Sequence, residues 1–211
     1  MKKILLGVAA AAGLSASAAG ATTLYFVAYA NTSGEHGIVD GSAINFSGLN
    51  VTFNAAGNHP YFDSSTPAEV AKGGAGLGVC HTLDVSLQCI PKRDDNIQNP
   101  EQVTLSFGTA QTLSGLLFNE TGHFAFTGTR AMNNTLLFAI NGGALTSYSF
   151  ASLMTLSFSN VFSATFAYGG THAKQFYLGA ATAAVPLPAG APLLLGALGL
   201  LGFGAARRRK Q

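Results

Sequence analysis

Two cysteines have the clearest potential for covalent chemistry in this sequence. Cys80 and Cys89 are the only cysteines, and eight residues separate them. In an exported chain an even number of cysteines indicates a disulfide, here one that closes a short loop. Two reduced thiols or a metal-binding pair are the alternatives, but one pair without CxxC or HExxH spacing is weak as a zinc site. The spacing therefore predicts a Cys80–Cys89 disulfide.

A group of oxygen-bearing side chains follows the second cysteine. Asp94, Asp95 and Asn96 are consecutive, and Glu101 lies five residues further on. Carboxylate and amide oxygens are the ligands that Ca²⁺ prefers, so these four residues are a candidate calcium site. The alternative is that they cap turns by accepting hydrogen bonds from backbone amides, or that Asp94 pairs with one of the two basic residues before it. We expect no other cofactor.

The sequence lacks the spacing patterns of common catalytic sites. There is no Gly-x-Ser-x-Gly elbow, and the glycine run at residues 73–78 fits neither a phosphate loop nor a dinucleotide motif. The five histidines lie in separate segments, where a surface or turn role is the simplest interpretation. We therefore expect no enzymatic activity. A secreted hydrolase is the least favoured alternative, because it would need two carboxylates in one cleft.

The C-terminus combines an exposed hinge, an apolar run and a basic end. Pro186 and Pro188 fix φ and lack amide donors, which keeps residues 185–189 extended and accessible. Residues 189–206 are 18 residues without a charge, or about 27 Å of helix, enough to cross a hydrocarbon core. The basic cluster that follows holds its end on the cytoplasmic side. These four residues are Arg207, Arg208, Arg209 and Lys210.

This tail resembles a PEP-CTERM sorting signal in its VPLPA variant. The motif is matched letter for letter by Val185, Pro186, Leu187, Pro188 and Ala189. The resemblance covers residues 185–210 and implies export from a Gram-negative bacterium and recognition by an exosortase-type membrane enzyme. It also implies transient anchoring in the inner membrane, then release to the cell surface or the extracellular matrix. An uncut C-terminal anchor is the alternative.

The N-terminus also predicts export. Lys2 and Lys3 precede an apolar run at residues 4–14, and small residues follow. This pattern is typical of a secretory signal peptide, which is too short to be a spanning anchor. We expect cleavage after Ala21, with Ala18 as the alternative site. The predicted organisation is a signal peptide at 1–21, an exported domain at 22–184 and a sorting signal at 185–211.

Charge in the exported domain excludes a basic nucleic-acid interface. Six of the eleven Lys and Arg residues lie in the two targeting segments, whereas all nine acids lie between Glu35 and Glu120. The domain therefore holds five basic residues against nine acidic ones. We expect no nucleic-acid partner.

Period-two alternation recurs through the domain and predicts many short strands. Asn141-Gly142 between two apolar runs is the strongest hairpin pattern. Turns are also expected at Phe107-Gly108 and Gly169-Gly170, and one helical turn at 67–72. The candidate strands cover residues 23–29, 43–46, 51–54, 103–107, 112–118, 123–126, 135–140, 154–158, 162–168 and 175–178.

This number of short strands in one domain predicts an all-β fold, an antiparallel β-sandwich of jelly-roll type. A signal helix would precede it and a transmembrane helix would follow it. The segment Gly76-Leu77-Gly78-Val79, followed by an Asp/Asn pair and by Glu101 ahead of an alternating strand, resembles the exported domains of other proteins with such tails. That resemblance implies a β-sandwich and assigns no activity.

The predicted function is that of an exported surface or matrix protein, associated with biofilm or exopolysaccharide and sorted through its C-terminus. A carbohydrate-binding module for exopolysaccharide is the alternative. The chain has no Trp, so tyrosines would have to supply any ring that stacks on a sugar.

Overall fold

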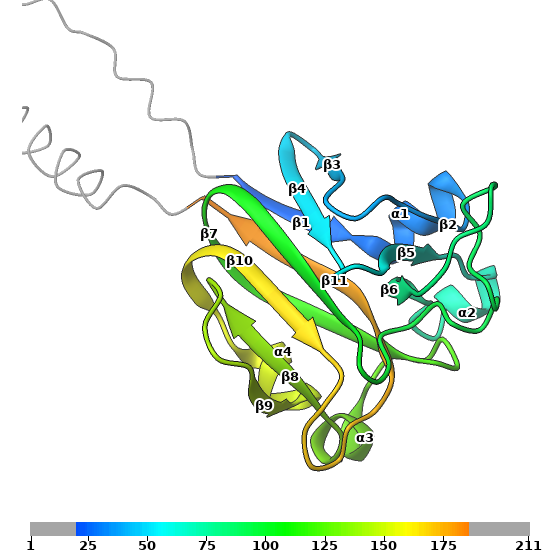
Figure 1. Ribbon diagram of the computed structural model, residues 1–211. Coiled ribbons are helices and arrows are strands. Elements are labelled where there is room, and N and C mark those ends of the chain that lie inside the picture. The colour runs from blue at the N-terminus through cyan, green and yellow to red at the C-terminus, as the bar shows by residue number, and fades with distance from the viewer. Residues whose placement is uncertain (1–19, 186–211) are drawn as a thin grey trace, which may run out of the picture. The chain divides into compact units, whose positions relative to one another are not determined.

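The computed structural model describes residues 20–185, which form an antiparallel all-β fold (Figure 1). The predicted fold class is thus confirmed at the level of an all-β domain. The strands are β1 (Ala21–Tyr25), β2 (His36–Gly37), β3 (Ala43–Phe46), β4 (Leu49–Asn54), β5 (His59–Asp63), β6 (Gly76–Cys80), β7 (Gln102–Glu120), β8 (Thr135–Ile140), β9 (Thr146–Ser149), β10 (Phe158–Ala167) and β11 (Phe176–Ala184). The helices are α1 (Phe26–Ser33), α2 (Pro67–Val70), α3 (Gly128–Asn133) and α4 (Phe150–Thr155).

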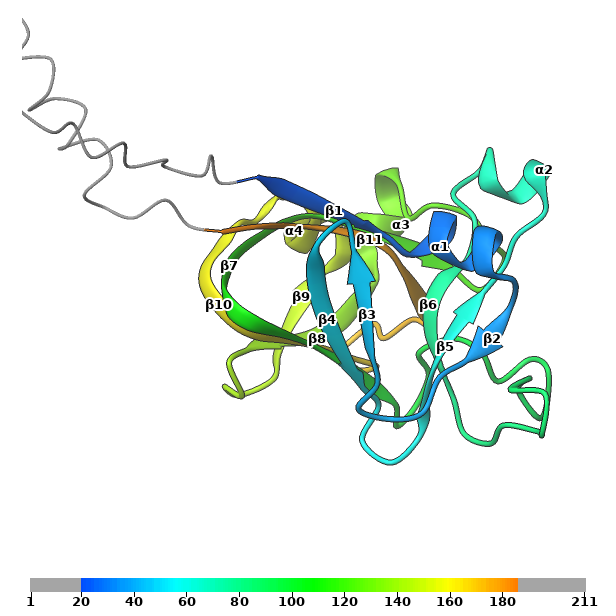
Figure 2. The ribbon, with the colours of Figure 1, turned by 90° about the horizontal axis from the view of Figure 1, so that it is seen from above.

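The strands join in one sheet whose main order is β2-β5-β6-β11-β7-β10-β8-β9. β1 pairs with β11, and the β3–β4 hairpin joins β7 through β4. Seen from above, the strands curve round the interior instead of lying in one plane (Figure 2). This curvature lets a single sheet enclose a core.

β7 is the strand that connects the parts of the sheet. Its first half pairs with β4 and β10, and its second half pairs with β11. The prediction of two strands divided at Phe107-Gly108 was wrong, since β7 runs on as 19 residues. Its buried positions are odd-numbered as far as Leu113 and include Leu116 and Phe118 beyond it. Gly115, with φ of 57°, lies where the alternation shifts.

Aromatic side chains fill much of the core. Phe118 of β7 contacts Phe150, Phe166 and Phe176 with ring centroids 5.2, 6.0 and 5.8 Å apart. Phe26 of α1 packs edge-to-face on Phe46 and Phe53 in a second group. Three helices bury residues in this interior: Phe26 and Ala30 from α1, Ala131 from α3, and Phe150 and Leu153 from α4.

Several local predictions are confirmed. The strands at 43–46 and 135–140 match β3 and β8 in full. Asn141 and Gly142 have φ of 53° and 69°, the left-handed values that a type I′ turn needs, and β8 pairs with β9 beyond them. The helical turn is α2, which begins with a capping box between Thr66 and Glu69.

Three predicted strands were wrong in whole or part. The strand predicted at 23–29 ends at Tyr25, because α1 begins at Phe26 and buries Phe26 and Ala30 four residues apart. Of the strand predicted at 154–158, Met154 and Thr155 end α4 and only Phe158 belongs to a strand, β10; the first turn of α4 is capped by the Ser149 hydroxyl. Residues 123–126 form only isolated bridges.

Candidate functional site

Among the hollows on the domain, two contrast in their chemistry. The larger, about 630 Å³, is almost entirely apolar and is bordered by Leu117, Met132 and Met154 among others. It presents few groups that can orient a polar ligand. The smaller, about 400 Å³, is polar, and we call it the polar pocket. Its walls are Lys92, Arg93, Asp95, Asn96, Thr121, His123, Gln175 and Tyr177.

Three segments build the polar pocket. The loop between β6 and β7 contributes Asp95 and Asn96, the turn after β7 contributes His123, and the start of β11 contributes Tyr177. Backbone hydrogen bonds between Ile97 and Phe176, at 2.8 and 3.3 Å, fasten the loop to β11. The pocket floor is thereby held on the sheet.

Tyr177 and Asp95 form the centre of the floor. The Tyr177 hydroxyl donates to Asp95 Oδ1 at 2.8 Å, and Tyr177 is 2% exposed. Burial raises the pKa of Tyr177 well above its ordinary value, with the charges of Asp63 and Asp95 adding to the effect. Burial, reinforced by the nearby Asp63 charge, raises the pKa of Asp95 to about 6. At pH 7 the floor therefore keeps a neutral phenol beside an acidic group.

His123 connects this centre to two further acids. Its Nε2 lies 3.0 Å from Asp63 Oδ2 at the end of β5, and its Nδ1 lies 3.3 Å from Glu69 Oε1 of α2. The close contact with the Asp63 carboxylate is the main cause that raises the pKa of His123 above its usual range, with burial opposing it. The imidazole also meets the Tyr177 ring edge-to-face at 5.6 Å. Asp63 contacts His123 but does not itself line the pocket.

Asn96 brings an unused acceptor to the pocket. The residue is 5% exposed, and its Oδ1 has no hydrogen-bond partner among residues 20–185. Buried polar atoms nearly always have a partner, so an unpaired acceptor in a residue that lines the pocket is a candidate for a hydrogen bond from a ligand.

Two glycines of β6 allow neighbouring backbone to approach closely, the loop at Gly78 and β11 at Gly76. A Cβ on Gly78 would overlap the Asp95 carbonyl oxygen and lie 2.8 Å from Asn96 Cα. Gly76, at φ of 126°, would place a Cβ 2.6 Å from the Leu178 carbonyl oxygen of β11. The Gly76-Leu77-Gly78-Val79 pattern therefore has a steric reason, because neighbouring backbone passes directly over both glycines.

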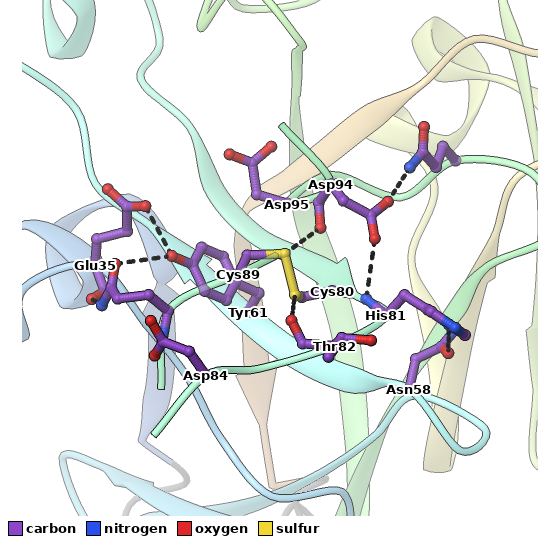
Figure 3. The surroundings of a disulfide bond; sticks show 12 residues. Glu35, Asn58, Tyr61, Cys80, His81, Thr82, Asp84, Cys89, Asp94 and Asp95 are labelled. Carbon is purple, nitrogen blue, oxygen red and sulfur yellow. Dashed lines mark hydrogen bonds between the residues drawn. A yellow bond between two sulfur atoms is a disulfide. The ribbon is translucent and has the colours of Figure 1, made fainter. Parts of the chain in front are cut away.

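The disulfide prediction is confirmed. Cys80 at the end of β6 bonds to Cys89 with an S–S distance of 2.02 Å and Cα atoms 5.7 Å apart (Figure 3). Their sulfurs lie 3.0 and 2.6 Å from the carbonyl oxygens of Thr82 and Asp94, and these are sulfur–oxygen contacts because a disulfide has no S–H. The buried Tyr61 ring packs beside the disulfide. The Tyr61 hydroxyl donates a hydrogen bond to Glu35 Oε1 at 2.7 Å.

The structure does not gather the predicted calcium ligands into one site. Asp94 accepts from the His81 amide at 3.2 Å and from the Gln98 side chain, whereas Asp95 accepts from Tyr177. Glu101 Oε2 accepts from the Gln98 amide at 3.0 Å. Among residues 20–185, only Cys80, Cys89 and Asp94 place three potential metal-binding side chains together, and both cysteines are oxidised. The geometry favours the turn-capping interpretation.

Neither basic residue before the loop pairs with Asp94. The salt bridges within the described part of the chain join His123 to Asp63 and Glu69, and Arg130 to Glu120. Lys92 and Arg93 instead border the polar pocket. The loop is held by hydrogen bonds to neutral groups, not by ion pairs to its own neighbours.

Most of the two predicted targeting segments lies outside the described residues. Val185 is the last described residue of the sorting motif, and its side chain is 49% exposed. The remainder of the motif, the apolar run, the basic cluster and residues 1–19 of the predicted signal peptide fall outside residues 20–185, whereas Ala21, before the expected cleavage point, begins β1. Within that range, no helix has the length and apolar character needed to span a bilayer.

Comparison with known proteins does not test the predicted targeting segments. No family model, curated protein or solved structure matches this chain. The resemblance of the tail to a sorting signal accordingly stays a prediction, as does the absence of catalysis.

Sequence reasoning missed His123, Asp63 and Tyr177 as members of one site. The sequence interpretation treated His123 as one of several scattered histidines, and nothing in its local pattern singles it out. The nearest pointer was the Asp94-Asp95-Asn96 run, of which two residues do line the polar pocket.

Glu101 predicts a pH dependence of stability. Burial raises its pKa from 4.5 to about 7. Because the folded pKa is the higher one, its contribution is full below about pH 4.5 and is lost as the pH rises through 7. Asp95 and His123 change stability in the same direction. Glu101→Gln keeps an oxygen for the Gln98 amide, so we expect it to stabilise the fold by about 1–2 kcal/mol at pH 8 and little at pH 4.

Thermal unfolding of both proteins between pH 4 and pH 9 measures this difference. The wild-type protein should be the less stable one only at the higher pH values. Parallel stability curves for the two proteins would contradict the assignment to Glu101.

Proposed function

We propose that this chain is an exported surface or extracellular-matrix protein, sorted and cleaved through its C-terminal signal. The observation that carries the proposal is the order of Val185-Pro186-Leu187-Pro188-Ala189, an 18-residue uncharged run and a basic end. An exosortase-type enzyme of the inner membrane is the partner that this order implies. The mechanism is that of a cargo: the tail anchors in the membrane, the hinge is cut, and the domain moves outward.

Two features of the described domain support export. A disulfide is typical of proteins that fold outside the reducing cytoplasm. β11 ends at Ala184, and the motif begins with the next residue, half-exposed Val185. A processing enzyme would therefore meet the motif directly beyond the last strand. Within this proposal, the curled sheet is interpreted as a β-sandwich of jelly-roll type with a membrane helix after it.

Mass spectrometry of the mature protein from its own cells tests the proposal. We expect an N-terminus at Thr22 and a C-terminus close to the motif, without the Arg207–Lys210 cluster. Pro186→Ala with Pro188→Ala should leave the tail uncut, because the hinge gains two amide donors and loses its fixed φ. Pro192→Ala, outside the motif, is the matched control and should be processed normally. Native protein that retains its arginine cluster while the enzyme is active would contradict cleavage.

Carbohydrate binding is the second candidate, and the polar pocket is the observation that favours it. A hollow of about 400 Å³ with a buried free acceptor, a carboxylate and a phenol suits a small ligand rich in hydroxyl groups. The hydrolase alternative gains no comparable support, since within residues 20–185 Asp95 is the sole carboxylate on the pocket wall.

A further inference from the structure

The floor of the polar pocket offers hydrogen-bond acceptors. Asn96 Oδ1 is buried without a partner. The Tyr177 hydroxyl already donates its one hydrogen bond to Asp95, so that its remaining hydrogen-bonding capacity is that of an acceptor. Asp95 uses Oδ1 for that bond, and a carboxylate has a second oxygen. A ligand group that binds to these oxygens must therefore donate hydrogen bonds.

The rim offers the opposite chemistry. Lys92 and Arg93 are exposed, border the polar pocket, and take no part in the salt bridges found among residues 20–185. Both side chains carry only donors and a positive charge. Thr121, in the turn after β7, adds a hydroxyl to the pocket lining. A ligand group at the rim should therefore be negatively charged.

These two cations are not part of a generally basic surface. The exported domain has five basic residues against nine acidic ones, so its overall field does not attract anions. Two of those five cations border this one pocket. Because the rim is cationic and the floor offers acceptors, a ligand with one anionic end and several hydroxyl groups would bind in one orientation.

We propose that the polar pocket binds a uronate unit of an acidic saccharide. Its ring hydroxyls donate to Asn96 and Asp95, and its carboxylate is bound by Lys92 and Arg93. The inference rests on the proposed function, because a protein at the cell surface meets polysaccharide there. A pocket of about 400 Å³ accommodates one or two sugar rings.

Calorimetric titration of the purified exported protein tests the inference. The ligands are short oligosaccharides of pectate, alginate and hyaluronate, with the methyl ester of the pectate oligosaccharide as its uncharged match. We expect saturable binding of at least one acidic form, and for pectate a loss of about tenfold or more in affinity on esterification. Added salt should weaken binding of the acid and not of the ester.

Matched variants place the effect in the pocket. Lys92→Gln with Arg93→Gln should weaken acid binding about tenfold or more while leaving binding of the ester unchanged. Lys174→Gln, an exposed cation that does not line the pocket, is the control and should keep most of the affinity. Asn96→Leu should weaken binding of both forms, because the hydroxyl acceptor is lost.

Each other outcome overturns the inference in a recognisable way. Equal binding of acid and ester would remove the carboxylate from the recognition and leave saccharide binding intact. Binding of free α-amino acids in place of uronates would assign the accepting floor to an ammonium group. The absence of saturable binding to all three acidic saccharides would end the saccharide proposal, whereas the processing of the tail is judged separately by mass spectrometry.

Discussion

Gly78→Ala is expected to destabilise the domain by about 3 kcal/mol and to disturb the polar pocket. The added Cβ would overlap the backbone of Asp95 and press on Asn96 Cα at 2.8 Å. Backbone atoms cannot rotate away as a flexible side chain can, so the loop or β6 must move. The loop is tied to β11 through Ile97, which leaves little freedom for that movement.

Chemical denaturation measures the loss of stability directly. Gly108→Ala is the matched control, because a Cβ there meets nothing within 4 Å and the residue also lies in a strand. The control should change stability by well under about 1 kcal/mol. Equal effects of the two substitutions would show that the loop does not depend on the glycine. Saccharide affinity should fall in Gly78→Ala at temperatures where the protein is still folded.

Replacing both cysteines by serine is expected to lower stability by about 2–3 kcal/mol. The disulfide closes a loop with eight residues between the cysteines. That loop also forms hydrogen bonds with the N-terminal part of the domain. The Gln88 side-chain amide donates to the Glu35 backbone carbonyl at 2.6 Å, and the Gly37 backbone N–H donates to the Leu87 carbonyl at 2.8 Å. Opening the loop thus weakens contacts beyond the bond itself.

Thermal unfolding with and without reductant provides the measurement. Reductant should lower the melting temperature of the wild-type protein and leave that of Cys80→Ser with Cys89→Ser unchanged. A wild-type protein insensitive to reductant under conditions that open the bond would argue that the loop is held by its hydrogen bonds alone. The same experiment on Gly78→Ala separates the steric effect from the covalent one.

Local patterns predicted those elements whose reasons are themselves local. The strand at 135–140 follows from a short continuous apolar run, and the turn after it follows from Asn141-Gly142, which tolerate positive φ. The disulfide follows from two cysteines too close in sequence to need a long-range contact. Each of these features is determined by residues within about ten positions of one another.

The wrong predictions share a different cause. The segment around Met154 alternates like a strand, yet the core accepts Phe150 and Leu153 from one face of a helix, and Ser149 caps that helix. Gly108 looked like a turn, but Phe107 before it pairs with Val51 of β4 and Gln111 beyond it pairs with Val161 of β10, so β7 continues through it. Tertiary packing overrode a weak local preference in both places.

The sequence by itself determined the all-β class, the disulfide and the candidate sorting tail, because alternation, spacing and a linear motif are all written along the chain. Only the tertiary structure placed His123, Asp63, Asp95 and Tyr177 together, and it separated Asp94 and Glu101 from them. The physical reason is that Tyr177 and Asp95 are 82 residues apart and meet through strand order and register. Those depend on how the whole sheet closes over its core, and no local pattern of residues encodes them.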